Sequence, residues 1–197
     1  MTLFKFLLVT FVALGLSACA NNQSGEPPRF NIQDSLGATV SAKPYPKKLS
    51  LVFFGYTYCP DICPTGLQAF AQTMDMLGED AKHIQPIFVT IDPERDTASL
   101  MEEYVSNFHD SFIGVTGSLK QISALAKVYE AEYSKAYYMD EDEPDGVSYL
   151  MDHTGWIYLV SPGGFMTPEK DLLELWGHGI DPQELADGIR EFLPPKL

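Results

Sequence analysis

The chain has 197 residues, and its 27 acidic and 13 basic side chains give a formal net charge of −14. A charge excess of this size repels phosphate backbones, so we expect no nucleic acid among the partners. With 45% hydrophobic residues, the chain is long enough for one domain with an ordinary core.

The N-terminal end of the chain is typical of a leader followed by a tether. Residues 1–18 carry Lys5 and then an apolar run, as in a secretory signal peptide, and this run is too short for a permanent membrane span. The sequence Leu-Ser-Ala-Cys resembles a bacterial lipobox, so we expect Cys19 to be lipidated and to anchor the protein to a membrane. Ordinary cleavage that leaves this thiol free is the alternative. Residues 19–28 would then be the lipid-anchored tether, and 29–197 the domain.

The rest of the chain alternates between strand and helix patterns. Segments 30–32 and 39–41 predict an N-terminal β-hairpin. Three strand–helix pairs follow, at 51–55 with 64–77, 86–91 with 97–108, and 112–115 with 118–129. This βαβ alternation predicts a largely parallel sheet.

After residue 129 the hydrophobic period changes. Strands at 133–139 and 147–151 predict an inserted hairpin with an acidic tip, followed by a strand at 156–160 and a closing helix at 182–193. The order of elements predicts an α/β, thioredoxin-like fold with an N-terminal hairpin extension and an inserted hairpin before the last strands.

Cys59 and Cys63 lie at the first core strand-to-helix turn, which is the reactive position of that fold. The start of a helix favours thiolate over thiol, so cysteines there are reactive or bind metal.

Thioredoxin-type redox sites usually have two residues between the cysteines; here there are three, with Asp61 in the middle. A carboxylate so close should raise the thiol pKa values, which hinders a nucleophile but is tolerable beside a cation. The spacing therefore favours a soft metal such as Cu(I) or Zn(II). A purely structural disulfide is disfavoured, since closing so short a loop stabilises by only about 2 kcal/mol.

A metal held by two thiolates requires a third ligand, and His153 is the strongest candidate. It follows a predicted strand and falls in about the place where thioredoxin-like enzymes present a cis-proline. Asp152 beside it is expected to support the imidazole from outside the ligand set. We expect His83 and His109 to be solvated surface residues and His178 to lie in a loop.

Other patterns have plainer explanations. The segment from Asp92 to Asp96 predicts a turn ordered by an Arg95–carboxylate pair, with a helix cap at Asp96 or Thr97. The acidic residues between 141 and 152 approach the spacing of a calcium loop, but strand-like flanks favour a solvated hairpin tip. Packing is the expected role of the methionines that could offer a thioether to copper, which are Met74, Met76 and Met151.

Three sequence blocks resemble the signatures of the Sco/SenC (PrrC-like) family. They are Phe54-Gly-Tyr-Thr-Tyr-Cys-Pro-Asp-Ile-Cys-Pro64, Thr90-Ile-Asp-Pro-Glu-Arg-Asp-Thr97, and Asp152-His-Thr154 with Tyr158-Leu-Val160. The resemblance runs from about Phe30 to Leu193. It implies a thioredoxin-like copper protein that assists assembly of the dinuclear copper centre of cytochrome c oxidase.

The resemblance also implies site residues. One copper per chain, as Cu(I) or Cu(II), would be held by Cys59, Cys63 and His153, while Asp61 would affect copper handling or docking without being a firm ligand. The location implied is a bacterial envelope, with the domain facing the periplasm. Family members are often held by a transmembrane helix, whereas this chain has the lipobox. The residue after the lipobox cysteine is Ala20, and not the aspartate that is associated with retention in the inner membrane. The choice between inner and outer membrane stays open.

Two functions from different classes follow. The first is a metallochaperone that passes copper to a subunit of cytochrome c oxidase or to another periplasmic copper protein without turnover. The second is a thiol-disulfide oxidoreductase in which Cys59 and Cys63 act catalytically to reduce the cysteines of the oxidase copper site or of another partner. We rank the metallochaperone first.

Overall fold

The structure is a computed structural model that describes residues 32–34, 40, 45–144 and 146–194. The predicted signal peptide, the lipidation site Cys19 and the tether lie outside these residues, as does most of the predicted N-terminal hairpin. Among the residues described, no helix is both long and apolar enough to cross a bilayer.

A six-stranded mixed sheet forms the centre of the described domain. Across the sheet the strands are β1 (Gln33–Asp34), β4 (Ile113–Thr116), β3 (Ile84–Thr90), β2 (Leu49–Gly55), β7 (Trp156–Val160) and β8 (Leu172–Gly177). β2, β3 and β4 are parallel, whereas β1, β7 and β8 pair antiparallel with their neighbours. β2 and β3 are buried along their whole length, which explains why their sequences are apolar runs without alternation.

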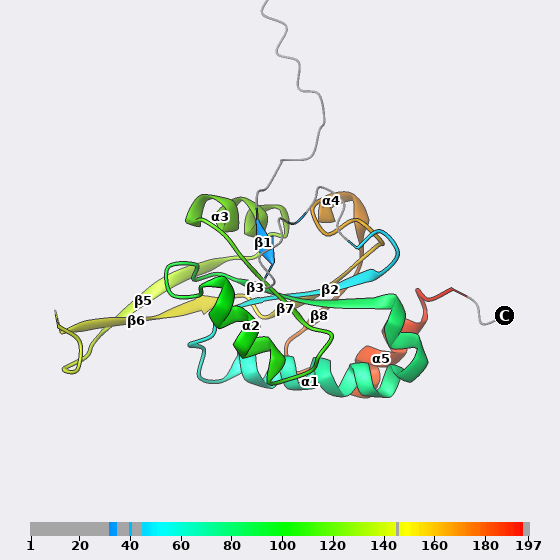
Figure 1. Ribbon diagram of the computed structural model, residues 1–197, viewed down its shortest axis with the longest axis horizontal. Helices are drawn as coiled ribbons and strands as arrows, with labels where there is room; N and C mark the ends of the chain where they lie inside the picture. Colours follow the sequence, from blue (N-terminus) through cyan, green and yellow to red (C-terminus); the bar gives the residue numbers. More distant parts are fainter. Residues whose placement is uncertain (1–31, 35–39, 41–44, 145, 195–197) are drawn as a thin grey trace, which may run out of the picture.

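Helices cover both faces of this sheet (Figure 1). α1 (Ile62–Leu77), α2 (Ala98–Ser106) and α5 (Pro182–Arg190) lie on one face, and α3 (Leu119–Val128) and α4 (Pro168–Asp171) lie on the other. A short 3₁₀ helix, η1 (Gly78–His83), leads from α1 into β3. This is the predicted thioredoxin-like arrangement.

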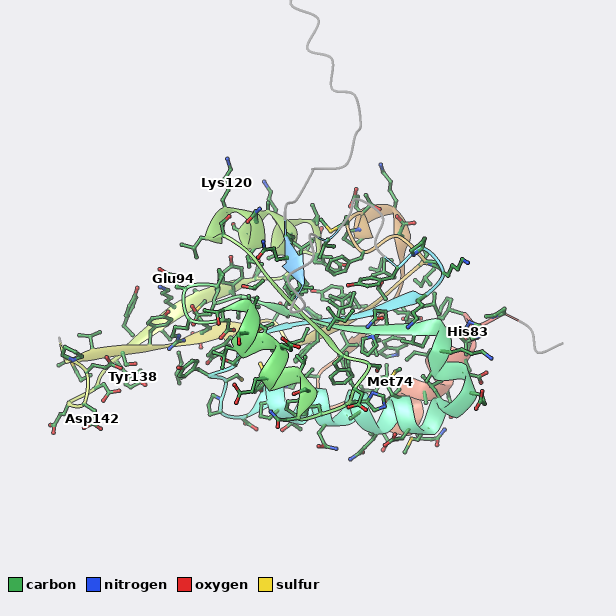
Figure 2. All side chains as sticks on the ribbon, in the orientation of Figure 1. Met74, His83, Glu94, Lys120, Tyr138 and Asp142 are labelled. Atoms are coloured by element: carbon green, nitrogen blue, oxygen red, sulfur yellow. The ribbon has the colours of Figure 1, made fainter. Side chains whose placement is uncertain are left out.

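The predicted inserted hairpin is present as a separate two-stranded sheet. β5 (Tyr133–Met139) and β6 (Val147–His153) pair antiparallel with each other, and in Figure 1 they project away from the body of the domain. Figure 2 shows Tyr138 and Asp142 at the far end of this arm. The register pairs His153 with Tyr133, so His153 lies at the base of the arm, beside the core.

Most predicted elements are confirmed, with differences at the chain ends. β1 pairs with β4, and Val40 N–H donates to the Ile32 carbonyl at 2.7 Å, which is the described part of the predicted N-terminal hairpin. The Ser118 capping box is present, and Thr97 rather than Asp96 caps α2.

α4 and β8 were not predicted. β8 is a partly exposed edge strand, so it lacks the alternation that identifies a half-buried strand.

Candidate metal centre

The end of β2 and the start of α1 position the two cysteines. β2 ends at Gly55, and α1 begins at Ile62, so Cys59 lies in the connecting turn and Cys63 in the first turn of the helix. Both are buried free thiols. The backbone N–H of Cys63 donates to Cys59 Sγ at 3.4 Å. The spacing of four residues therefore brings both sulfurs to the same side of the helix N-terminus.

A glycine at the end of β2 makes room for the second sulfur. A Cβ atom at position 55 would lie 2.5 Å from Cys63 Sγ and 2.7 Å from a ring carbon of Phe88. Because both distances are shorter than real Cβ contacts, a side chain at position 55 would force Cys63 and Phe88 to shift. This role of Gly55 was not among the predictions from the sequence, although its position directly before the cysteine turn is a signal for it.

The last residue of β6 brings the imidazole to the cysteines. His153 Nε2 lies 3.5 Å from Cys63 Sγ, and Nδ1 lies 3.0 Å from the carbonyl oxygen of Thr154. Since a carbonyl can only accept, this contact assigns a proton to Nδ1, so in the neutral imidazole the Nε2 lone pair faces the sulfur. A neutral imidazole in this form is a metal ligand. The ring of Tyr56 meets the imidazole edge-on at 6.1 Å between centroids.

The three side chains form a compact cluster of donors. The two sulfurs and one imidazole nitrogen all lie within 4.8 Å of one another. Within the part of the chain that the structure describes, no other three His, Cys, Asp or Glu side chains come close enough to share an ion. Two sulfurs and an imidazole suit copper or zinc and do not suit hard cations such as Mg²⁺ or Ca²⁺.

The two thiols differ sharply in acidity. A hydrogen bond from Cys63 lowers the pKa of Cys59 to about 4 despite its burial, and the backbone N–H groups of Asp61 and Cys63 assist. Burial raises the pKa of Cys63, and the neighbouring Cys59 sulfur raises it further. In the metal-free site one sulfur is therefore a thiolate, and the other keeps its proton.

Asp61 does not act on the cysteines as the sequence predicted. We expected its carboxylate to raise the thiol pKa values, but the side chain is exposed, whereas its backbone N–H stabilises the Cys59 thiolate. The helix start dominates because the amide points at the sulfur and the carboxylate does not cap the helix.

Asp152 is also placed differently from the prediction that it supports the imidazole. The hydrogen-bond partner of His153 Nδ1 is the backbone carbonyl of Thr154. Asp152 is exposed, and as the preceding residue of a strand it projects from the opposite face. Because any residue type carries a carbonyl, the sequence holds no signal for the role of Thr154.

The other histidines lie away from this cluster. In Figure 2 His83 lies at the end of the domain opposite to the hairpin arm. His109 pairs with Ser111 through Nδ1, at 2.8 Å, and His178 is an exposed loop residue that contacts Gly155. Met74 and Met151 are buried, in agreement with packing roles, and Met76 is exposed.

An open groove of about 850 Å³ borders the imidazole. It lies between the C-terminal half of α3 and the base of the hairpin, and its lining includes Lys127, Tyr133 and His153. The cysteines are buried, but the histidine side of the cluster is thus accessible from solvent.

Comparison with known proteins gives consistent matches. Residues 20–193 match the protein family described as SCO1/SenC. Protein SCO1 homolog 1, mitochondrial, of Arabidopsis thaliana is 37% identical over 161 residues, which are 81% of this chain and 45% of that protein. An SCO2-like protein of Rickettsia felis is 36% identical over 135 residues, which are 68% of this chain and 64% of that protein. The chain thus spans about half to two thirds of the length of these relatives.

Solved structures match over most of the chain. The crystal structure of Arabidopsis thaliana ScoI with copper bound has a TM-score of 0.69 and 34% identity, covering 83% of this chain and 97% of that one. The structure of Bradyrhizobium japonicum ScoI with copper bound has a TM-score of 0.71 and 32% identity, with the same coverage.

The acidity of Cys59 can be tested by alkylation of the reduced, metal-free protein. Because the pKa of Cys59 is lowered to about 4, its thiolate is present across neutral pH, and its rate of reaction with iodoacetamide should change little between about pH 5.5 and pH 8. Cys63→Ala removes the main hydrogen-bond donor, so the pKa of Cys59 should rise and the rate should become pH-dependent in that range. Peptide mass spectrometry measures the rate at Cys59. A wild-type rate that climbs steeply toward pH 8.5 would contradict the assignment.

The close approach at Gly55 predicts a cost for a single methyl group. Gly55→Ala should lower the free energy of unfolding by about 1–3 kcal/mol, since Cys63 Sγ and Phe88 must both move. Urea unfolding measures the change. Gly177→Ala is the matched control, because a Cβ there meets only an ordinary contact at 3.9 Å. Equal effects of the two substitutions would refute the steric argument.

Proposed function

This chain belongs to the SCO1/SenC family, and from that membership and the geometry of its site we propose that it is a copper metallochaperone for assembly of the dinuclear copper centre of cytochrome c oxidase. The observation that carries the proposal is the convergence of Cys59, Cys63 and His153, with donor atoms within 4.8 Å. Related proteins of 34% and 32% identity are described with copper bound.

The donor set suits either oxidation state of copper. Thiolates are soft ligands that favour Cu(I), and the imidazole adds the nitrogen donor that Cu(II) prefers. Two thiolates, one neutral imidazole and Cu(I) carry a net charge of −1, which the N-terminus of α1 offsets in part. We propose one copper per chain.

The residues enter binding in different protonation states. Cys59 is a thiolate before the metal arrives, and the contact of His153 Nδ1 with the Thr154 carbonyl leaves Nε2 as the ring nitrogen that faces the metal. Cys63 has a raised pKa and must lose its proton to become a ligand. Copper binding should therefore release about one proton per chain at neutral pH and strengthen as pH rises.

We extend the proposal to location and domain boundaries. Residues 1–18 would be a signal peptide, Cys19 a lipidated anchor and 19–28 a tether, leaving the domain at 29–197 facing the periplasm of a bacterial envelope. The supporting observation is the sequence Leu-Ser-Ala-Cys after an apolar run. The receiving partner would be a copper-binding subunit of cytochrome c oxidase or another periplasmic copper protein.

A thiol-disulfide oxidoreductase is the second candidate, and the low pKa of Cys59 beside a protonated Cys63 favours it. In that reaction the Cys59 thiolate attacks a partner disulfide and one partner sulfur leaves as a thiolate. Cys63, after losing its proton, attacks the mixed disulfide. The products are a Cys59–Cys63 disulfide and a reduced partner, so two electrons pass to the partner.

Anaerobic titration with Cu(I) and Cu(II) tests the carrier proposal. The wild-type domain should bind about one copper, and His153→Ala should weaken Cu(II) binding by more than about 100-fold, because loss of a direct ligand exceeds the 10- to 100-fold cost of losing a supporting residue. The double Cys59→Ser, Cys63→Ser variant should bind neither ion tightly. Unchanged Cu(II) affinity and absorption in His153→Ala would reject this ligand set.

The reductase alternative makes a different prediction. Disulfide exchange should survive in His153→Ala, whereas Cys63→Ser should trap a mixed disulfide through Cys59. Non-reducing electrophoresis with the apo copper domain of the oxidase subunit, its cysteines first oxidised, measures the trapped species. Failure to trap any adduct would count against the redox function.

A further inference from the structure

The loop between β3 and α2, residues 91–97, contacts both halves of the metal centre. We propose that Arg95 is a positioning residue that keeps His153 within reach of the cysteines, while Asp96 of the same loop fastens the cysteine turn. The loop would then act as a clamp that sets the separation between sulfur and imidazole. This inference rests on the proposed function but concerns residues outside the ligand set.

Asp96 holds the cysteine turn. Its carboxylate is fully buried and accepts three hydrogen bonds, from Thr57 N at 3.1 Å, Thr57 Oγ1 at 2.6 Å and Thr90 Oγ1 at 2.6 Å. Thr90 is the last residue of β3, and Thr57 lies two residues before Cys59. The turn that carries the first sulfur is thus tied through one side chain to the central sheet.

Arg95 holds the strand that carries the histidine. Its Nε donates to buried Asp92, and its Nη1 donates to the main-chain oxygen of Tyr149 at 3.0 Å. The guanidinium carbon lies 3.8 Å from the centroid of the Tyr149 ring, and the Tyr149 hydroxyl donates to Asp92 Oδ1 at 3.0 Å. Tyr149 is therefore held at its backbone, its ring and its hydroxyl. It lies four residues before His153 on β6, and residues at even spacing on a strand share a face.

The same guanidinium reaches toward the cysteine turn. It lies 4.9 Å from the ring centroid of Tyr58, the residue before Cys59, and 5.8 Å from that of Tyr56. Tyr56 in turn accepts a hydrogen bond from Met151 N at 3.1 Å through its hydroxyl. Arg95 thus lies between the turn and β6, where cation–π contacts stabilise it against both.

The geometry of the hairpin makes such a clamp necessary. β5 and β6 form their own sheet, and the register pairs them with each other and not with the central sheet. A two-stranded hairpin is marginally stable alone, so its orientation depends on the contacts at its base. Since one residue along a strand spans about 3.3 Å, a shift of one position would carry Nε2 out of reach of Cys63.

Two variants distinguish positioning from general stabilisation. Arg95→Met keeps an apolar stem and removes every donor, so it should weaken Cu(II) binding by about 10- to 100-fold, with an absorption spectrum shifted toward that of His153→Ala. Cu(I) binding should change much less, because both thiolates remain. If Arg95 acts through His153, the double variant Arg95→Met, His153→Ala should bind Cu(II) no more weakly than His153→Ala alone.

Glu94→Gln is the matched control. Glu94 forms an ion pair with Lys135 of β5, so it also joins this loop to the hairpin, but it does so at the surface, where Figure 2 shows it. An exposed pair contributes little, and copper binding should stay at the wild-type level. Arg95→Lys keeps the charge but not the planar fork, so it should give an intermediate Cu(II) affinity; it also carries the test if Arg95→Met does not fold.

A metal-free measurement keeps this inference separate from the proposed function. In the NMR spectrum of the reduced apo protein, nuclear Overhauser contacts between the ring protons of His153 and Tyr56 should be present in wild type and Glu94→Gln, and weakened in Arg95→Met and Arg95→Lys. If the wild-type protein bound no copper, the proposed function would be rejected. The NMR contacts in the apo protein would still decide whether Arg95 positions His153. Variants of Arg95 that lower the melting temperature while Cu(II) affinity, spectrum and these contacts stay unchanged would overturn the positioning role.

Discussion

The site depends on one long-range contact, between a sulfur at the start of α1 and an imidazole 90 residues later in the chain. The other contacts described at the site support this one. A glycine makes room for the sulfur, a backbone carbonyl orients the imidazole, and the aromatic ring of Tyr56 packs against it. Cys63 lies on α1, whereas His153 lies on β6 of the separate two-stranded sheet, so their separation is fixed by side-chain contacts and not by a shared hydrogen-bonded ladder.

Protonation gives the two cysteines separate roles although only three residues separate them in the sequence. A single proton remains on Cys63, where burial raises the pKa, and the same proton stabilises the Cys59 thiolate. This arrangement serves metal carriage and thiol exchange equally well, because both begin with one thiolate and need the second thiol to ionise later. The function of the two cysteines therefore depends on the ligand or partner that reaches them. A soft cation binds both cysteines and His153, whereas exchange with a partner disulfide requires the cysteines alone.

Sequence reasoning succeeded where residue type alone determines the chemistry. The parallel core strands, the capped helices and the proximity of His153 to the cysteines follow from periodicity, from capping residues and from the position of the histidine after a strand. It failed where geometry or backbone groups decide. The orientation of His153 comes from the Thr154 carbonyl rather than from Asp152, and the Asp61 amide outweighs the Asp61 carboxylate. β8 was not predicted because polar and apolar residues need not alternate along an edge strand.

The projecting hairpin also separates the lifetime of the bound metal from the lifetime of the fold. Its outer half is largely solvated, with Tyr137 67% and Met139 81% exposed, so opening of the hairpin should cost less free energy than unfolding of the central sheet. Such partial opening would withdraw one ligand of three and leave a two-coordinate ion on the sulfurs. A cargo held in this way can leave without global unfolding, so a protein that is very resistant to denaturants can still be a kinetically labile donor.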